Sequence, residues 1–136
     1  MFKKLSFAVA LSLMSQMVAA HSLTIQLENV VPDTGDIRVA IFDDEKQFPN
    51  GEFAYSATVA ADTSLMTITV DGLPTGDFAI SLFQDLNQNT ELDTGFFGIP
   101  KEPYGFSGDW KKGKATFEEA VITINGDTEI SINMYD

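Results

Sequence analysis

Side-chain oxygens recur at alternate positions in one acidic segment of the sequence. The segment begins at Asp85 and continues through Asn87, Asn89, Glu91 and Asp93. Calcium binds six to eight hard oxygen ligands from a chain that can curl around the ion. An Asp-x-Asn-x-Asn start with a further Asp eight residues after the first matches positions one, three, five and nine of an EF-hand-like loop. The spacing therefore predicts a Ca²⁺ site formed by these five residues.

Two positions of this segment depart from the calcium-loop pattern. Position six is Thr90 instead of Gly, which disfavours the sharp turn, and position twelve is Phe96, so no bidentate Glu closes the site. Glu102 is the nearest carboxylate that could close it. The alternative interpretation is a loop without an ion, in which Asp and Asn side chains bond their own backbone.

Five aromatic residues follow within the same long segment: Phe96, Phe97, Tyr104, Phe106 and Trp110. Exposed rings can stack on a sugar or contact a protein, and Phe97, Tyr104, Phe106 and Trp110 are the candidates for such a binding surface. The alternative is a satellite core that holds the long segment against the rest of the domain.

For copper binding and for Ser/His/Asp catalysis the sequence does not offer a complete set of residues, and for glycan hydrolysis it selects no particular pair. His21 is the only histidine, so a copper site would have to rely on its ring and one amine, and a Ser/His/Asp triad would depend on the same side chain. Two carboxylates could hydrolyse a glycan, but with 20 acidic residues no spacing selects a pair. We therefore assign no catalytic residues.

The elements that must position these residues are short strands. Apolar and polar residues alternate over six stretches, which is typical of strands with one face on a core. The stretches are 23–28, 36–41, 65–70, 78–83, 121–125 and 129–134, and a shorter strand is expected at 55–60. Asn125-Gly126-Asp127 predicts a hairpin between the last two stretches. About seven strands predict an all-β protein, a single antiparallel Greek-key β-sandwich of the immunoglobulin-like kind.

The alternation also predicts which side chains face the core. We expect eleven of them to be buried: Ile25, Leu27, Val39, Ile41, Ile68, Val70, Ile80, Leu82, Ile122, Ile130 and Ile132. The segment 84–116 is not predicted to contain a strand, and Phe117–Ala120 has room for one helical turn.

The first twenty residues predict a secretory signal peptide. Lys3 and Lys4 precede an apolar run that ends in Val18-Ala19-Ala20, which offers small residues for cleavage. The run is shorter than the ~20 residues that a membrane span needs. We therefore expect residues 21–136 to form one domain without an integral membrane segment, exported to the periplasm or the medium.

The charge of the chain excludes some partners. The formal net charge is −12, and loss of Lys3 and Lys4 with the signal peptide makes it −14. Such a surface repels a phosphate backbone, which excludes nucleic acid, and it disfavours anionic membranes for the same reason. The chain contains no Cys, which excludes disulfides, thiolate metal sites and Cys nucleophiles.

Several motifs of the sequence match those of a known family. They are Leu92-Asp93, Phe97 to Glu102, Tyr104 to Ser107, Phe117 to Ala120 and Asn125 to Thr128. From about Ser22 to Asp136 the chain resembles a bacterial family of small exported proteins known as domain of unknown function 2141. The resemblance implies an exported β-sandwich similar to transthyretin-like domains, and it implies no established activity. Thr90 and Pro103 stand where the family pattern has Gly.

These observations favour an exported, non-enzymatic binding or structural module of the cell envelope with a calcium-ordered loop. Its partner would be an envelope protein or a polysaccharide. The alternative is a glycan-active hydrolase that uses acidic residues of the long loop. A cleft with two facing carboxylates would favour the hydrolase, whereas a compact loop with converging oxygens would favour the module.

Overall fold

A computed structural model describes residues 20–136 of the chain. The predicted signal peptide, Met1–Ala20, lies outside these residues except for Ala20. None of the helices within 20–136 is long and apolar enough to cross a membrane. The elements, in chain order, are β1 (His21–Glu28), β2 (Asp36–Phe42), β3 (Tyr55–Ala60), β4 (Leu65–Leu73), β5 (Gly76–Asp85), η1 (Phe96–Gly98), β6 (Tyr104–Phe106), α1 (Phe117–Ala120), β7 (Val121–Ile124) and β8 (Thr128–Asn133).

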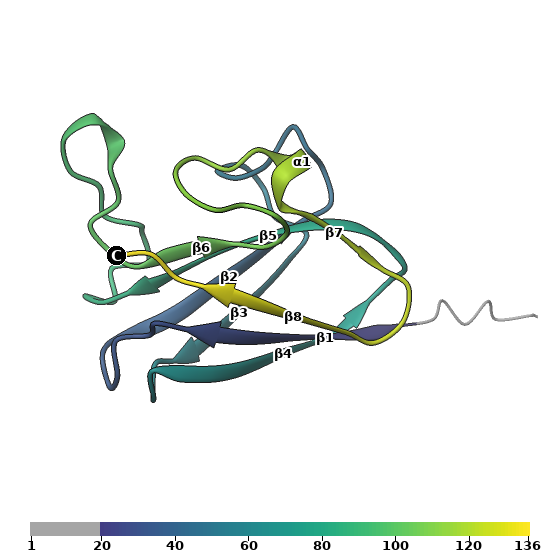
Figure 1. The fold of residues 1–136 in the computed structure, drawn as a ribbon, viewed down its shortest axis with the longest axis horizontal. Helices are drawn as coiled ribbons and strands as arrows, with labels where there is room; N and C mark the ends of the chain where they lie inside the picture. Colours follow the sequence, from purple (N-terminus) through teal and green to yellow (C-terminus); the bar gives the residue numbers. More distant parts are fainter. Residues whose placement is uncertain (1–19) are drawn as a thin grey trace, which may run out of the picture.

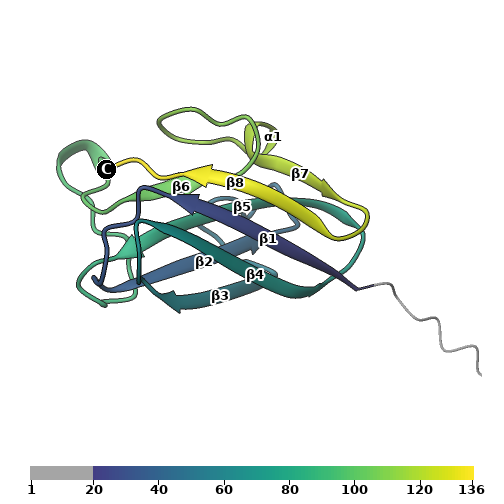
Figure 2. The same ribbon diagram turned by 60° about the horizontal axis from the view of Figure 1, so that its bottom comes forward.

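The strands form two sheets that pack against each other (Figures 1 and 2). One sheet has three strands in the order β4-β1-β8, and the other has five, in the order β3-β2-β5-β6 with β7 also paired to β5. Figure 2 shows β4, β1 and β8 lying across the strands of the larger sheet. The prediction of an all-β sandwich is confirmed. One pairing departs from a purely antiparallel sandwich, because β1 and β8 run parallel.

The predicted hairpin between the last two strands is wrong. β7 pairs with β5 in the larger sheet, whereas β8 pairs with β1 in the smaller one. The turn after Ile124, with Gly126 at a φ of 131°, therefore carries the chain from one sheet to the other. Ile124 and Ile132 reach the same core from opposite layers, and both are buried. Alternation shows that a strand has a buried face, but it does not show which strand bonds its backbone.

The segment 84–116 contains an eighth strand that was not predicted. β6 pairs with the end of β5, and β7 pairs with its beginning, so the two share one edge of β5. The buried Ser107 fills the interval between them, because its Oγ accepts from Ile80 N at 2.8 Å and donates to Ala120 O at 2.5 Å. Three residues, one of them Gly105, are too few to show alternation. The helical turn at Phe117–Ala120 is confirmed.

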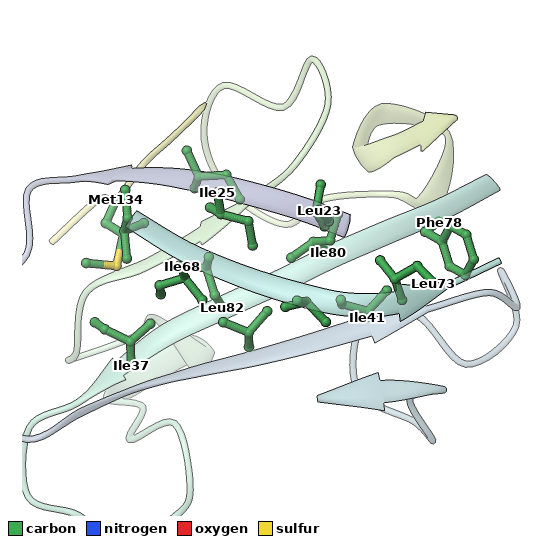
Figure 3. Close-up of a cluster of buried hydrophobic side chains, with 14 of the residues drawn as sticks. Leu23, Ile25, Ile37, Ile41, Ile68, Leu73, Phe78, Ile80, Leu82 and Met134 are labelled. Carbon is green, nitrogen blue, oxygen red and sulfur yellow. The ribbon is translucent and has the colours of Figure 1, made fainter. Parts of the chain in front are cut away.

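The core lies between the two sheets and consists almost entirely of aliphatic side chains (Figure 3). Nine of the eleven side chains predicted to face inward are buried. Ile122 and Ile130 are half-buried and pack against the core from its margin, because β7 and β8 lie at the edges of their sheets. The period-two pattern therefore gave the correct inward face for each of the six strands for which a face was predicted.

Candidate functional site

The acidic segment begins where the central strand of the larger sheet ends. Asp85 is the last residue of β5, and its side chain is fully buried. Arg38 Nε, from the neighbouring β2, donates to Asp85 Oδ2 at 2.8 Å. The backbone N–H groups of Asn89 and Thr90 donate to the same carboxylate at 3.1 and 2.8 Å. Within residues 20–136 this is the one salt bridge, and it fixes the start of the loop on the outer face of the sheet.

The environment of Asp85 stabilises its charged form. Burial of the carboxylate raises its pKa, but the hydrogen bonds from Arg38, Thr90 and Asn89 and the positive charge of Arg38 lower it by more. The pKa of Asp85 therefore lies below its ordinary value of 3.8. At neutral pH Asp85 is an ionised carboxylate whose charge is already compensated by a guanidinium.

The loop folds back so that two carboxamides meet one carboxylate. Asn87 Nδ2 donates to Asp93 Oδ2 at 2.6 Å, and Asn89 Nδ2 donates to Asp93 Oδ1 at 2.7 Å. The two Asn oxygens accept from backbone N–H groups, Asn87 Oδ1 from Asn89 at 3.3 Å and Asn89 Oδ1 from Glu91 at 3.0 Å. The structure thus brings Asn87, Asn89 and Asp93 together. Asp85 belongs to the separate network with Arg38, and Glu91 is exposed.

Glu102 closes the loop, through its hydrogen bonds to the backbone. It is 3% exposed, and its two carboxylate oxygens accept from Leu86 N at 2.7 Å and from Asp93 N at 2.8 Å. One side chain therefore joins the first and last turns of the loop. Glu102, the nearest carboxylate that could close the predicted site, therefore lies beside the loop, but both of its oxygens accept from backbone N–H groups.

The sharp turn forms although Thr90 replaces Gly. Thr90 has a φ of 71° and Gln88 a φ of 56°, both in the left-handed region that disfavours side chains with a Cβ, β-branched ones most strongly. Thr90 disfavours this turn, as expected from the sequence, but the turn forms nevertheless. The bonds from Thr90 N and Asn89 N to the Asp85 carboxylate explain how the strained backbone is held.

The loop rests on the connection between β1 and β2. Gln84 is fully buried, and its amide bonds Val31 N and O and Thr34 O at 2.7 to 2.8 Å. A Cβ on Gly35, which has a φ of 62°, would lie 2.0 Å from Asp85 O, so only glycine fits there. Sequence reasoning missed Arg38, Gln84 and Gly35. The local signals were weak: Gly35 lies in a predicted turn, Arg38 is a polar residue inside a predicted strand, and Gln84 directly follows another predicted strand.

The candidate aromatic surface divides into two parts. Tyr104, Phe106 and Trp110 stack on one another with ring centroids 4.9 to 6.1 Å apart. Trp110 is 8% exposed, and its Nε1 donates to Gly113 O at 2.8 Å. Phe97, by contrast, is fully exposed at the far end of the segment. The first three rings pack together as a satellite core, and Phe97 stands apart from them.

Three grooves on the described part of the chain contain few carboxylates. The largest, about 450 Å³, lies between residues 45–51 and 114–117 and includes Glu45 as its one acid. A second, about 330 Å³, lies on the outer face of the larger sheet and has no acid in its lining, and a third, about 310 Å³, has none either. None of these three grooves presents two facing carboxylates. His21 lies apart from all three, with Nε2 2.9 Å from Thr75 Oγ1.

Comparison with known proteins identifies the family. Residues 25–133 match DUF2141, described as an uncharacterised protein conserved in bacteria. No curated protein and no solved structure matches the chain. Because the match spans most of the sequence and includes the loop, β6 and the satellite core, the chain belongs to the DUF2141 family of uncharacterised bacterial proteins.

Proposed function

We propose that this protein is an exported, non-enzymatic binding or structural module of the cell envelope whose loop 85–93 is ordered by Ca²⁺. One observation carries the proposal: Asn87 and Asn89 converge on the carboxylate of Asp93 at 2.6 and 2.7 Å. Three side chains that contain oxygen atoms therefore lie next to one another at the surface. Asp93 is also free of any Lys or Arg partner among residues 20–136.

The three side chains can change from a hydrogen-bonded cluster to a set of ligands. A carboxamide offers either an NH₂ group or an oxygen, depending on which way round it stands. With both amides reversed, Asn87 and Asn89 would add two oxygens to those of Asp93. Calcium takes six to eight oxygens, so water or backbone carbonyls would supply the remainder. Few protein ligands favour weak affinity, in the ~10⁻⁴–10⁻³ M range of extracellular modules.

The other predicted ligands have different parts in this proposal. Asp85 would have to give up its salt bridge with Arg38 to bind the ion. In this proposal Asp85 therefore does not bind Ca²⁺ but holds the backbone of the loop through its hydrogen bonds to Asn89 N and Thr90 N. Glu91 is exposed and adjacent, and it is available as a further ligand. No three His, Asp or Glu side chains within residues 20–136 gather as a metal site. The proposal therefore depends on the two carboxamides.

The distribution of carboxylates supports a module over the alternative, a glycan-active hydrolase. Hydrolysis of a glycoside needs two carboxyl groups about 5–10 Å apart across a cleft. The three grooves described above contain at most one acid each. The acidic loop lies beside the second groove, to which it contributes Thr90 and Leu92, neither of which can transfer a proton as an acid would. An envelope protein or polysaccharide is the partner we propose.

Export is tested by the mass of the processed protein. We expect expression with residues 1–20 intact to yield a protein that begins at His21, because the charged start, apolar run and Ala20 fit a signal-peptidase site. Intact-mass spectrometry of protein released from the envelope or medium measures the product directly. Exported protein that retains Met1 would contradict the expectation.

Calcium binding is tested by thermal melting of the protein from His21 onward. A ligand that binds only the folded state adds RT ln(1 + [L]/Kd), about 2.7 kcal/mol when free Ca²⁺ exceeds Kd a hundredfold. We expect millimolar Ca²⁺ to raise the Tm relative to chelator, and Asp93→Asn to remove most of the increase. Asp62→Asn makes the same charge change at an exposed turn and should respond as wild type does.

Two results would contradict the calcium proposal. If Ca²⁺ leaves the wild-type Tm unchanged, the loop is held by its own hydrogen bonds alone. If Asp93→Asn and Asp62→Asn respond equally, the ion binds elsewhere on the acidic surface. Asp85→Ala is the less specific variant, because it also removes the partner of Arg38.

A further inference from the structure

A small hairpin projects from the larger sheet between β5 and β6, and we call Thr94–Lys101 the finger (Figure 1, green loop at the upper left). Thr94 and Pro100 form a β-bridge, Gly95 N donates to Ile99 O at 2.8 Å, and Lys101 N donates to Asp93 O at 2.8 Å. Backbone hydrogen bonds therefore hold the two sides of the finger together. Its tip extends away from both sheets (Figure 1).

The tip exposes three large apolar side chains. Phe96 is 91% exposed, Phe97 is 100% exposed and Ile99 is 63% exposed. Phe97 also has a φ of 61°, which is uncommon for a bulky residue. These side chains add nothing to the hydrophobic core, since none of them belongs to it. Neighbouring apolar residues that remain this exposed mark a surface that contacts a partner.

The charge of the finger differs from that of the rest of the chain. Its eight residues contain no acid and one base, Lys101, on a chain with 20 Asp and Glu. The two acids that flank it are both engaged: Asp93 with the amides of Asn87 and Asn89, and Glu102 with backbone N–H groups. The finger therefore contains no acid and has an apolar tip, so its approach to an apolar medium desolvates no carboxylate of its own.

We infer that the finger inserts Phe96, Phe97 and Ile99 into the headgroup–acyl boundary of a lipid bilayer with zwitterionic headgroups. The tip is convex, and a fluid interface accepts a convex apolar tip without a matching pocket. Phe and Leu side chains are buried at this depth by amphipathic helices that lie in the bilayer interface. The strong negative charge of the remaining surface repels anionic headgroups, so net-neutral lipids are the surface that fits. The inference goes beyond the proposed function and does not depend on calcium.

The test is co-sedimentation of the protein from His21 onward with phosphatidylcholine vesicles, in chelator. We expect wild type to bind, and Phe96→Ser/Phe97→Ser to bind about a hundredfold more weakly, because each of the two rings buried in an apolar phase contributes about a factor of ten or more. Leu65→Ser is the matched control. Leu65 is 67% exposed in the other sheet, so its loss should leave binding unchanged. Thermal melting should show that all variants remain folded.

A second measurement distinguishes insertion from adsorption. In Phe97→Trp, we expect vesicles to shift the emission of the new indole to shorter wavelength, whereas Trp110 is already buried and does not respond. Phosphatidylglycerol vesicles should bind more weakly at low salt than at high salt, since salt screens the repulsion. Failure of wild type to bind phosphatidylcholine, or equal binding by the double Ser variant, would overturn the inference. Because chelator is present throughout, a negative calcium result leaves this test intact.

Discussion

Replacing Ile80 with Ala is expected to lower the free energy of unfolding by about 2–5 kcal/mol. Ile80 lies at the middle of β5, the central strand of the larger sheet, and its side chain is fully buried in the core (Figure 3). Truncation removes apolar burial and leaves a cavity that two packed sheets cannot easily close. Urea denaturation, monitored through the fluorescence of Trp110, measures the change.

Two further variants define what the Ile80 result means. Ile132→Ala, in β8 of the opposite sheet, should destabilise by a similar amount, since Ile132 is 2% exposed. Ile99→Ala in the finger should change stability by no more than about 0.5 kcal/mol, because Ile99 is 63% exposed. An Ile80→Ala protein with the wild-type denaturation midpoint would show that β5 does not turn this face to the core.

Replacing Arg38 with Met is expected to destabilise the protein by about 3 kcal/mol, because it leaves the fully buried carboxylate of Asp85 without its counter-charge. The value lies at the low end for a buried pair, since Arg38 is 27% exposed and Asp85 keeps its two backbone N–H donors. Methionine retains the apolar stem of Arg38, so lost packing contributes little. Chemical denaturation at pH 7 measures the difference.

A double variant separates the charge from the contact. Arg38→Met/Asp85→Asn removes both charges, and we expect it to be more stable than Arg38→Met alone. If the loss of stability in the double variant equals the sum of the losses in Arg38→Met and Asp85→Asn, the two residues act independently. The unpaired buried charge is then not the cause of the loss in Arg38→Met.

The same pair gives the protein a defined response to acid. The pKa of Asp85 in the folded protein is below the 3.8 of the unfolded chain, so the ionised form favours folding. Its contribution is complete above pH 3.8 and is lost as the pH falls through the folded value. Asp85→Asn should therefore flatten the loss of stability as the pH falls below 3.8.

The loop and the finger are mechanically connected. Asp93 accepts the two carboxamides through its side chain and Lys101 N through its backbone oxygen. One residue therefore makes hydrogen bonds both within the loop and to the base of the finger. The outer groove of the larger sheet also includes Thr90 and Leu92, so the loop borders both the finger and that groove.

The sequence by itself determined the inward faces of most strands of this protein and the place of its loop. Alternation at period two follows from one buried face, so Ile80, Leu82 and their counterparts could be placed inward without any knowledge of the neighbouring strands. The Asp and Asn spacing likewise located the segment in which Asn87, Asn89 and Asp93 meet, because these residues are within six positions of one another. Both properties depend only on residues that are close together in the sequence, so they can be predicted without knowledge of the tertiary structure.

The tertiary structure alone decided which distant groups meet. Arg38 and Asp85 are 47 positions apart, and nothing near either residue specifies the other. The parallel pairing of β8 with β1 and the division of the aromatic residues, with Trp110 buried and Phe97 exposed, are of the same kind. Each of these features depends on how the two sheets and the long loop pack. The sequence cannot distinguish them, because an aromatic residue is equally hydrophobic whether its ring packs in the protein or projects into solvent.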